Sequence, residues 1–270
     1  MKIVNVVICY ENIDEIITYA KQFQNVQDQN VIELVIVINK IENNYQIKTL
    51  TEALYKLNIR FRIYNPNKNL GYLNGMIYGY KQYKKNGIAD WIIMSNTDIV
   101  YDVQEFSNYL SNKKYELDTW CIGPSIYSNG RKSYDNPVSI ERRKKSDIKK
   151  IIRILKTPII NILYVALSDI KARMLPKKTG KSGFVYEVHG CFFIVKKELA
   201  DLLVERNFPA FLYSEEAYIA ELCYQNGKKI YYDTDVEVKH LEHSVTGFLK
   251  KRKIAKYISE SLQIILDLFY

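Results

Sequence analysis

Three places in the sequence carry side chains suited to metal or acid–base chemistry. Asp98 ends a short polar run directly behind an apolar stretch, and its carboxylate could give a hard oxygen ligand to a divalent cation. His240 follows another apolar stretch, and an imidazole nitrogen could complete the same shell. Glu215 and Glu216 form an acidic pair, and a carboxylate within reach of a hydroxyl can act as a general base.

Each of these residues also has an ordinary structural explanation. An Asp that follows a strand often caps a turn or a helix. A single histidine such as His240 is often half-buried and satisfied by its neighbours, and His243 competes with it for the same role. Acidic residues in a first helical turn interact favourably with the helix dipole, and Ser214 could cap that helix. The residues alone therefore leave both interpretations open.

The elements that must position these side chains follow the pattern of βαβ units in the first half of the chain. Strands are expected at Ile3–Cys9, Glu33–Ile38, Phe61–Tyr64 and Asp90–Met94. Apolar residues at helical spacing predict helices from Ile13 to Phe23 and from Ile47 to Leu57, and Asn12 with Glu15 resembles a capping box for the first of them. This alternation predicts an α/β fold with a mostly parallel central sheet flanked by helices.

The pattern becomes irregular after Gly123-Pro124 and recovers later in the chain. The later strands are expected at Phe184–Val188, Cys191–Val195, Lys229–Tyr232 and Val236–Val238, with helices near Lys196–Val204 and from Ser214 onward. We expect one domain over residues 1–247, followed by a basic, amphipathic helical tail over residues 248–270.

Polar residues near the carboxyl ends of the early strands are candidates for ligand contact, because open α/β sheets bind ligands at that edge. The candidates are Tyr10, Asn12, Asn39, Asn69, Gly71, Asn74 and Asn96. The turn after the first strand lacks the GxGxxG spacing that a dinucleotide-binding unit requires, which argues against NAD or FAD.

The order of these motifs resembles glycosyltransferase family 2. That family has an N-x-G-x-x-x-G loop, here Asn69–Gly75, followed by a degenerate D-x-D, here Asn96–Asp98. A glycine-bearing acceptor strand, an acidic pair that opens a helix and a histidine after a late strand recur in the same order, and Gly190, Glu215-Glu216 and His240 match them. The resemblance covers roughly residues 3–247.

The resemblance implies a GT-A fold and an inverting transfer of a sugar from a nucleoside diphosphate sugar. It assigns Asp98 and His240 to a divalent metal, Mn²⁺ or Mg²⁺, and Glu216 to the general base, with Glu215 orienting the base or binding the acceptor. The polar candidates at the sheet edge would contact the nucleotide sugar. The expected acceptor is a saccharide or lipid-linked saccharide in surface-polysaccharide assembly. One departure is Ile38, which stands where the family usually has an Asp that contacts the nucleotide base.

A basic segment between Glu141 and Lys178 contains 12 Lys and Arg against 3 Asp and Glu, so it carries a net charge equal to the +9 of the whole chain. Apolar residues at helical spacing from Ile148 to Ile170, interrupted at Thr157-Pro158, predict two inserted helices. Their apolar stripe would either pack against the protein or lie on an anionic membrane surface. No RNA-binding motif accompanies the patch, so nucleic acid is not an expected partner.

The cysteines and the apolar runs bear on where the protein is located, and two other classes of protein are alternatives to a glycosyltransferase. The four cysteines are far apart in a 270-residue chain and no run approaches the ~20 apolar residues of a membrane span, so we expect a cytoplasmic protein, peripheral on the membrane if the basic segment binds lipid. A non-catalytic nucleotide-sugar or membrane-binding protein on a degenerate GT-A fold is one alternative. A sugar-nucleotide pyrophosphorylase is another, but Tyr10-Glu11-Asn12 provides no glycine- and lysine-rich triphosphate loop.

Overall fold

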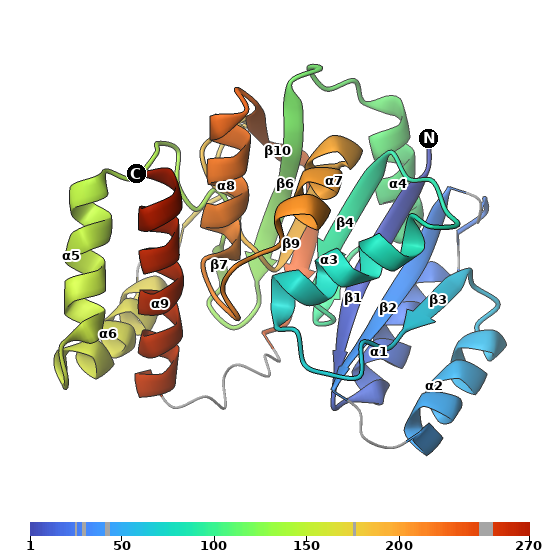
Figure 1. Cartoon of the computed structure of the whole chain (residues 1–270). Coiled ribbons are helices and arrows are strands. Elements are labelled where there is room, and N and C mark those ends of the chain that lie inside the picture. The colour runs from blue at the N-terminus through green and yellow to red at the C-terminus, as the bar shows by residue number, and fades with distance from the viewer. Residues whose placement is uncertain (25, 29–30, 41–43, 175–176, 243–250) are drawn as a thin grey trace.

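The computed structural model describes the chain except residues 25, 29–30, 41–43, 175–176 and 243–250 (Figure 1). One ten-stranded sheet runs through the molecule in the order β3-β2-β1-β4-β9-β6-β10-β5, with β7 paired to β6 and β8 paired to β10. Helices cover both faces of this sheet, as the alternating pattern of the sequence predicts.

The first half of the sheet is parallel. Its strands are β1 (Ile3–Tyr10), β2 (Ile32–Lys40), β3 (Phe61–Tyr64) and β4 (Trp91–Ser95). The helices of this half are α1 (Ile13–Ala20), the 3₁₀ turn η1 (Lys21–Phe23), α2 (Asn44–Lys56) and α3 (Tyr72–Tyr83). Both faces of β1 and β2 are buried, one in a core shared with α1 and α2 and the other in a core shared with α3. Such strands read as nearly continuous apolar runs, which is why the sequence predicts them well.

The second half of the sheet is mixed. It contains β5 (Ile99–Val100), β6 (Thr119–Ser128), β7 (Ser133–Tyr134), β8 (Gly183–Val185), β9 (Phe192–Lys196) and β10 (Lys229–His240). Strand β9 runs antiparallel to both β4 and β6, whereas β10 runs parallel to β6. Helices α4 (Val103–Asn112), α7 (Lys197–Arg206) and α8 (Glu215–Gln225) complete this half, with α7 and α8 on the same face as α3 in Figure 1.

Two details of this half differ from the sequence expectation. Strand β6 continues through Gly123 and Pro124, where the pattern predicted irregular structure. The two short strands expected near the C-terminal end are one strand, β10, whose register with β6 shifts between Asp233 and Glu237, opposite Pro124 and Ser125. Proline has no amide hydrogen for the ladder, so an irregularity beside Pro124 allows both strands to continue.

The basic segment forms two helices, α5 (Lys145–Lys156) and α6 (Ile160–Met174), with the break where Thr157-Pro158 predicts it. They pack with the last helix, α9 (Lys251–Phe269), around a small core that includes Ile152, Val165 and Leu262 (Figure 1). By length and composition, no single helix of the described residues could cross a membrane, although α5 and the first part of α6 would qualify together as a pair bent by 117°.

Local predictions at the start of the chain also agree with the structure. Asn12 caps α1: its side-chain oxygen accepts from the Asp14 amide at 3.1 Å, and its amide nitrogen donates to Glu15 at 3.1 Å. All four cysteine thiols are free and buried. The division into a domain over residues 1–247 and a tail stays a prediction.

Candidate active site

The loop behind β3 is fixed to the carboxyl end of β2 by one buried amide. Asn39, the penultimate residue of β2, accepts from the Leu70 amide at 2.9 Å and donates to the Gly71 carbonyl at 2.8 Å and to the side-chain oxygen of Asn69 at 3.0 Å. Asn69 in turn accepts from the Gly71 amide at 2.9 Å. Asn39 and Asn69 therefore shape the start of α3 before any ligand is considered.

Gly71 occupies a backbone conformation that side chains do not tolerate, with φ of +80° and ψ of −171°. A Cβ atom at this position would lie 2.0 Å from the carbonyl oxygen of Phe211, in the segment that leads to α8. The loop behind β3 and the segment before α8 therefore pack closely here, and only glycine leaves room for this contact.

We expect Gly71→Ala to lower the free energy of unfolding by about 3 kcal/mol, since both the backbone conformation and the clash with Phe211 oppose it. Gly183→Ala is the matched control, because nothing lies within 4 Å of a Cβ atom there and its φ is not positive. Urea unfolding of the two variants measures the difference, and equal midpoints would contradict this account of Gly71.

The remaining polar candidates occupy different places along this edge. Asn74 is fully engaged within the protein: it donates to the carbonyls of Phe208 and Ala210 and accepts from the Phe208 amide at 2.9 Å. Tyr10 ends β1 and lies under the ammonium group of Lys40. The roles of these residues, and of Asn12, in ligand binding stay predictions.

The predicted metal pair meets at the end of the sheet. Asn96 donates its backbone amide to the carbonyl of Cys191 at 2.8 Å, which holds the turn that carries Asp98 against β9. The Nε2 atom of His240 lies 3.3 Å from Oδ2 of Asp98, and both side chains are buried. The Leu241 amide donates to the Asp98 carbonyl at 2.9 Å, so the two segments are also joined through the backbone.

Three further charged residues surround His240, and none of them was predicted. Oδ2 of Asp135 lies 3.7 Å from the Nδ1 atom of His240. The Arg131 guanidinium pairs with Asp135 at 3.0 Å and with Glu242 at 2.6 Å. Asp135, His240 and Glu242 each offer one ligand atom within 4.8 Å of the others, a spacing that could hold a metal ion. His243, the alternative to His240, lies outside the described residues.

The donor set fits a hard divalent cation. Both ring nitrogens of His240 are buried without a hydrogen bond of acceptable geometry, although a carboxylate lies beside each. A cation between the imidazole and a carboxylate would satisfy both groups. Burial alone would lower the pKa of His240, but Asp135, Asp98 and Cys191 raise it to about 12, so anionic groups dominate the electrostatics around this ring.

The segment between the metal pair and α8 is also charged. Burial alone would lower the pKa of His189, but Cys191, Asp135 and Glu216 raise it to about 9. Burial alone would raise the pKa of the Cys191 thiol, and the imidazoles of His189 and His240 bring it below its usual value. The rings of His189 and His240 lie 6.2 Å apart, so this segment connects the Asp98–His240 pair to Gly190 and the acidic pair.

The two members of the acidic pair have different surroundings. Glu215 is buried and accepts from the Tyr213 amide at 2.9 Å; burial and the neighbouring Glu216 raise its pKa to about 8. Glu216 is half-buried, and one of its carboxylate oxygens lies 3.2 Å from the position that a Cβ atom on Gly190 would take. Within the described part of the chain, the Glu216 carboxylate makes no hydrogen bond. It is the member of the pair available to an incoming hydroxyl.

The entry to α8 differs from the expected cap. Tyr213 and Ser214 both have left-handed backbones, with φ of 70° and 62°. The Ser214 side chain does not cap α8 and instead lies 3.0 Å from the hydroxyl of Ser261 in α9. Strained residues of this kind persist where the surrounding structure fixes them, often at functional sites.

Two more residues at this site were not predicted from the sequence. The Tyr72 hydroxyl donates to the Gly190 carbonyl at 2.9 Å, which ties α3 to the turn before β9, where Gly190 faces Glu216. Glu187 is buried; burial raises its pKa to about 7, and the nearby Glu216 carboxylate contributes in the same direction. Tyr72 lies inside the N-x-G-x-x-x-G loop, so the motif held a signal for it, whereas Glu187 lies in a segment with no motif.

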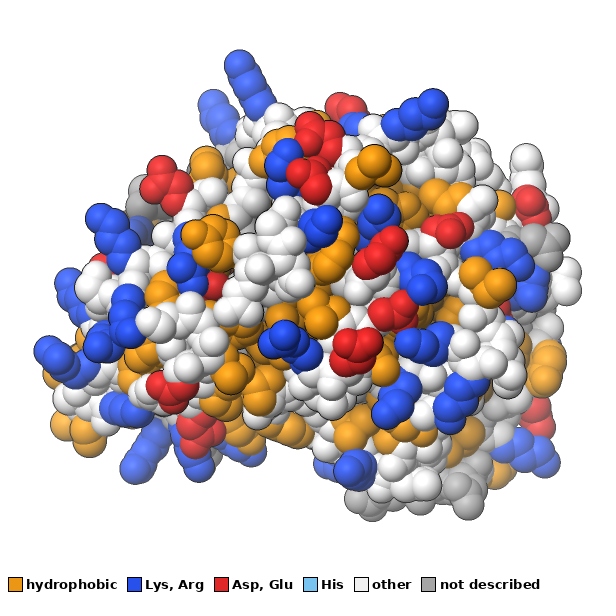
Figure 2. All heavy atoms as spheres, turned by 45° about the horizontal axis from the view of Figure 1, so that its top comes forward, with side chains coloured by type: hydrophobic (Ala, Val, Ile, Leu, Met, Phe, Trp, Pro, Cys, Tyr) orange, Lys and Arg blue, Asp and Glu red, His pale blue; other side chains and the backbone are white. Residues whose placement is uncertain are grey.

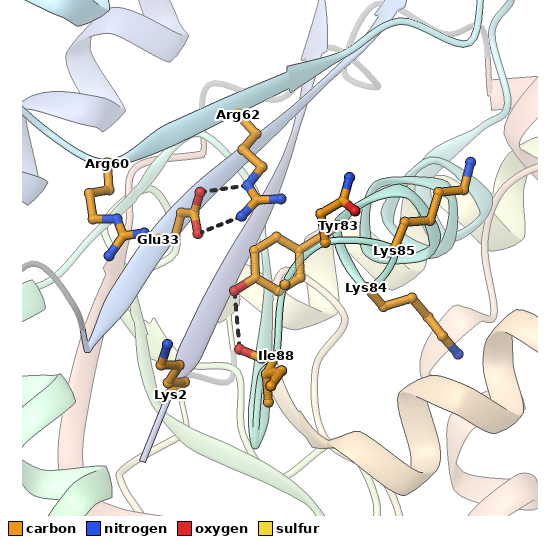
Figure 3. A pocket seen from close by; sticks show the side chains of 10 residues that line it. Lys2, Glu33, Arg60, Arg62, Tyr83, Lys84, Lys85 and Ile88 are labelled. Atoms are coloured by element: carbon orange, nitrogen blue, oxygen red, sulfur yellow. Dashed lines mark hydrogen bonds and ion pairs between the residues drawn. The ribbon is translucent and has the colours of Figure 1, made fainter.

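A hollow on the opposite edge of the sheet contrasts with this site. Figure 3 shows Lys2, Glu33, Arg60 and Arg62 at the amino ends of the parallel strands, with Tyr83 and Ile88 across from them. Arg62 pairs with Glu33 at 2.7 Å, and the Tyr83 hydroxyl donates to the Ile88 carbonyl. We place the site at the carboxyl edge instead, because that edge carries the converging histidine and carboxylates.

Comparison with known proteins finds matches among solved structures. The mannosyltransferase PcManGT from Pyrobaculum calidifontis, in complex with GDP-Man and Mn²⁺, matches with a TM-score of 0.57 at 10% identity over 97% of this chain. GalNAc-T7 with UDP, GalNAc and Mn²⁺ matches with a TM-score of 0.58 at 12% identity over 90% of this chain. The chain spans 64% and 44% of their lengths. No protein-family profile and no curated protein matches it.

These likenesses confirm the predicted GT-A class of α/β fold. Membership of glycosyltransferase family 2 stays a prediction.

Proposed function

We propose that the chain is a metal-dependent glycosyltransferase that moves a sugar from a nucleoside diphosphate sugar to an acceptor hydroxyl. One observation carries the proposal. The Glu216 carboxylate, without a hydrogen bond among the described residues, faces Gly190 on the same sheet edge where His240 and Asp98 lie 3.3 Å apart. A proton acceptor and a metal-binding site are the two features that metal-dependent, one-step transfer from a diphosphate leaving group requires.

The proposed reaction is a single displacement with inversion. The acceptor oxygen forms a bond to the anomeric carbon, the bond from that carbon to the diphosphate oxygen breaks, and the electron pair leaves with the diphosphate. Glu216 takes the proton of the acceptor hydroxyl. Glu215, held by the Tyr213 amide, positions its neighbour. Tyr72 fixes the turn at Gly190, against which the acceptor would lie.

Asp98 and the Nε2 atom of His240 would hold the divalent cation, Mn²⁺ or Mg²⁺. We prefer this side of the ring because Asp135 and Glu242 already face Arg131, which balances part of their charge. When bound, the cation supplies charge neutralisation at the departing diphosphate. Both solved structures reported above contain Mn²⁺, which supports the choice of metal.

The finer parts of the proposal concern the acceptor and the setting. We propose a saccharide or lipid-linked saccharide acceptor in surface-polysaccharide assembly. A cavity of about 400 Å³ between residues 209–212 and α9 could receive part of such an acceptor, since it adjoins the segment that leads to Glu216. A cytoplasmic location is supported by four buried, unpaired thiols.

A thermal-shift panel tests the function. GDP, UDP, GDP-mannose and UDP-N-acetylgalactosamine would each be added with Mn²⁺ and with chelator. We expect one nucleotide to raise the melting temperature by about 5 °C or more at 100 times its dissociation constant, and only with metal. No shift with any nucleotide would contradict the proposal. If a sugar donor raises the melting temperature but no nucleoside diphosphate is released from it, even slowly, the non-catalytic alternative is favoured.

A further inference from the structure

Helix α6 leaves a row of large apolar side chains uncovered. Five of them recur at spacings of three and four residues and therefore share one face of the helix, with exposed fractions of 49 to 73%: Ile160, Leu163, Leu167, Ile170 and Met174. Val165, which points away from this row, is buried in the core shared with α5 and α9. The row is about 21 Å long at 1.5 Å per residue. We call it the α6 stripe.

Exposed basic side chains lie on α6 and on its neighbour α9. Lys171 is exposed on α6 itself, and Lys251 and Arg252 are exposed in the first turn of α9, which Figure 1 shows beside α6. Among the described residues, none of these three makes an ion pair. Figure 2 shows further Lys and Arg side chains gathered at the end of the molecule formed by α5, α6 and α9 (left).

We propose that the α6 stripe is a docking surface for an anionic lipid bilayer. A helix with a row of large apolar side chains and free cations beside it lies in the plane of the interface, with the apolar row among the acyl chains and the cations at the anionic headgroups. Uncovered apolar patches of this kind commonly mark interaction sites. The proposal does not depend on the catalytic one.

A second copy of this chain is a poorer occupant than a bilayer. In a two-fold dimer the same surface of both copies meets, so the cations beside one stripe would approach those beside the other. Like charges brought together disfavour that contact, whereas an anionic headgroup layer neutralises them.

Arg142 and Arg143 belong to the basic segment of the sequence, but the structure does not leave them for a lipid surface. Arg142 pairs with the buried Glu221 at 2.8 Å and lies over the ring of Tyr270, and Arg143 pairs with the buried Glu187 at 3.3 Å. These arginines hold the segment before α5 to α8 and to Glu187. Reversing their charge would test folding and not lipid binding.

Vesicle flotation tests the α6 stripe. The parent chain should bind phosphatidylcholine vesicles that contain phosphatidylglycerol and bind pure phosphatidylcholine vesicles at least about tenfold more weakly, with binding reduced by salt. Leu163→Gln/Leu167→Gln should lower binding to the anionic vesicles by at least about tenfold, because it removes apolar contact. Lys171→Glu/Arg252→Glu should have an effect of similar size.

Matched controls come from elsewhere on the surface. Leu117→Gln alters a leucine that is 89% exposed, and Lys81→Glu/Lys114→Glu makes the same change in net charge as the reversal beside the stripe. Both controls should bind like the parent chain. Equal loss in controls and stripe variants, or no binding by the parent, would overturn the proposal. A dimer that dissociates in Leu163→Gln/Leu167→Gln without any vesicle binding would assign the stripe to a second copy instead.

Discussion

Glu216→Gln is expected to lower turnover by a factor of roughly 10²–10⁴, the usual contribution of a general base, while donor affinity stays nearly unchanged. The amide keeps the shape of the side chain but cannot take the acceptor proton. Glu216 faces Gly190 and makes no hydrogen bond within the described part of the chain, so the replacement breaks no structural contact there. Initial rates at saturating acceptor and calorimetric titration of the donor measure the two quantities.

Glu215→Gln should be much milder. Adjacent residues of a helix point about 100° apart, so one carboxylate of the pair can face the reacting carbon while the other cannot. Burial and Glu216 raise the pKa of Glu215 to about 8, so it is largely protonated at neutral pH and cannot serve as a base there. A glutamine at this position still offers an oxygen to the Tyr213 amide.

Glu198→Gln is the control for removing a first-turn carboxylate, because Glu198 lies exposed in the first turn of α7, away from the site. Its turnover should match that of the parent. A severe loss confined to Glu215→Gln would transfer the base to that residue. Full activity of both pair variants would end the catalytic interpretation of the pair.

The parts of the fold that the sequence predicted are those in which local pattern and tertiary structure agree. Strands β1, β2 and β4 are buried on both faces and read as apolar runs, and the break between α5 and α6 falls at a proline. Strand β6 was not recognised because Gly123 and Pro124 are poor strand formers. Its neighbours β9 and β10 stabilise it there, and this information lies far away in the sequence.

The juxtaposition at the candidate site was predictable where its residues follow strands. Asp98 and His240 were paired through the resemblance, and the structure brings them together. Asp135 could not be found in this way, because it follows the short strand β7 and meets His240 only through the pairing of β6 with β7 and β10. Glu242 lies two residues after His240, in a segment without a motif. Their partner Arg131 carries no motif either.

Two asparagines at the carboxyl edge of the sheet show why residue type alone can mislead. Asn39 and Asn74 were selected as ligand contacts, yet each uses its side-chain amide to hold a loop of the protein. Ile38 offers no base contact, since it is buried in the core shared with α1 and α2. Polar residues at a sheet edge can thus serve the architecture of a site, and sequence type alone does not separate this role from ligand binding.

The second large effect is expected on nucleotide affinity when the proposed metal site is removed. For the parent chain we expect Mn²⁺ to strengthen binding of GDP or UDP at least about tenfold, since the cation offsets diphosphate charge. Asp98→Asn should abolish that enhancement, because the amide loses the anionic ligand while the 3.3 Å contact with His240 keeps a partner of the same shape. Calorimetry with Mn²⁺ and with chelator measures both affinities.

Asp135→Asn distinguishes between two positions for the cation, one on each side of the His240 ring. If the cation lies between Asp98 and Nε2, Asp135 acts from behind by orienting the imidazole through Nδ1, and its loss should weaken metal affinity by about 10–100-fold without abolishing the enhancement. If the cation lies among Asp135, His240 and Glu242 instead, Asp135→Asn should abolish the enhancement and Asp98→Asn should only weaken it. Asp102→Asn, at the exposed cap of α4, controls for the loss of a carboxylate near the same strands and should leave metal dependence intact.

The parent chain itself gives the decisive result. If its affinity for the nucleotide is equal with metal and with chelator, the cation has no part in the proposed reaction. Neither Asp98 nor Asp135 would then hold a cation against the diphosphate.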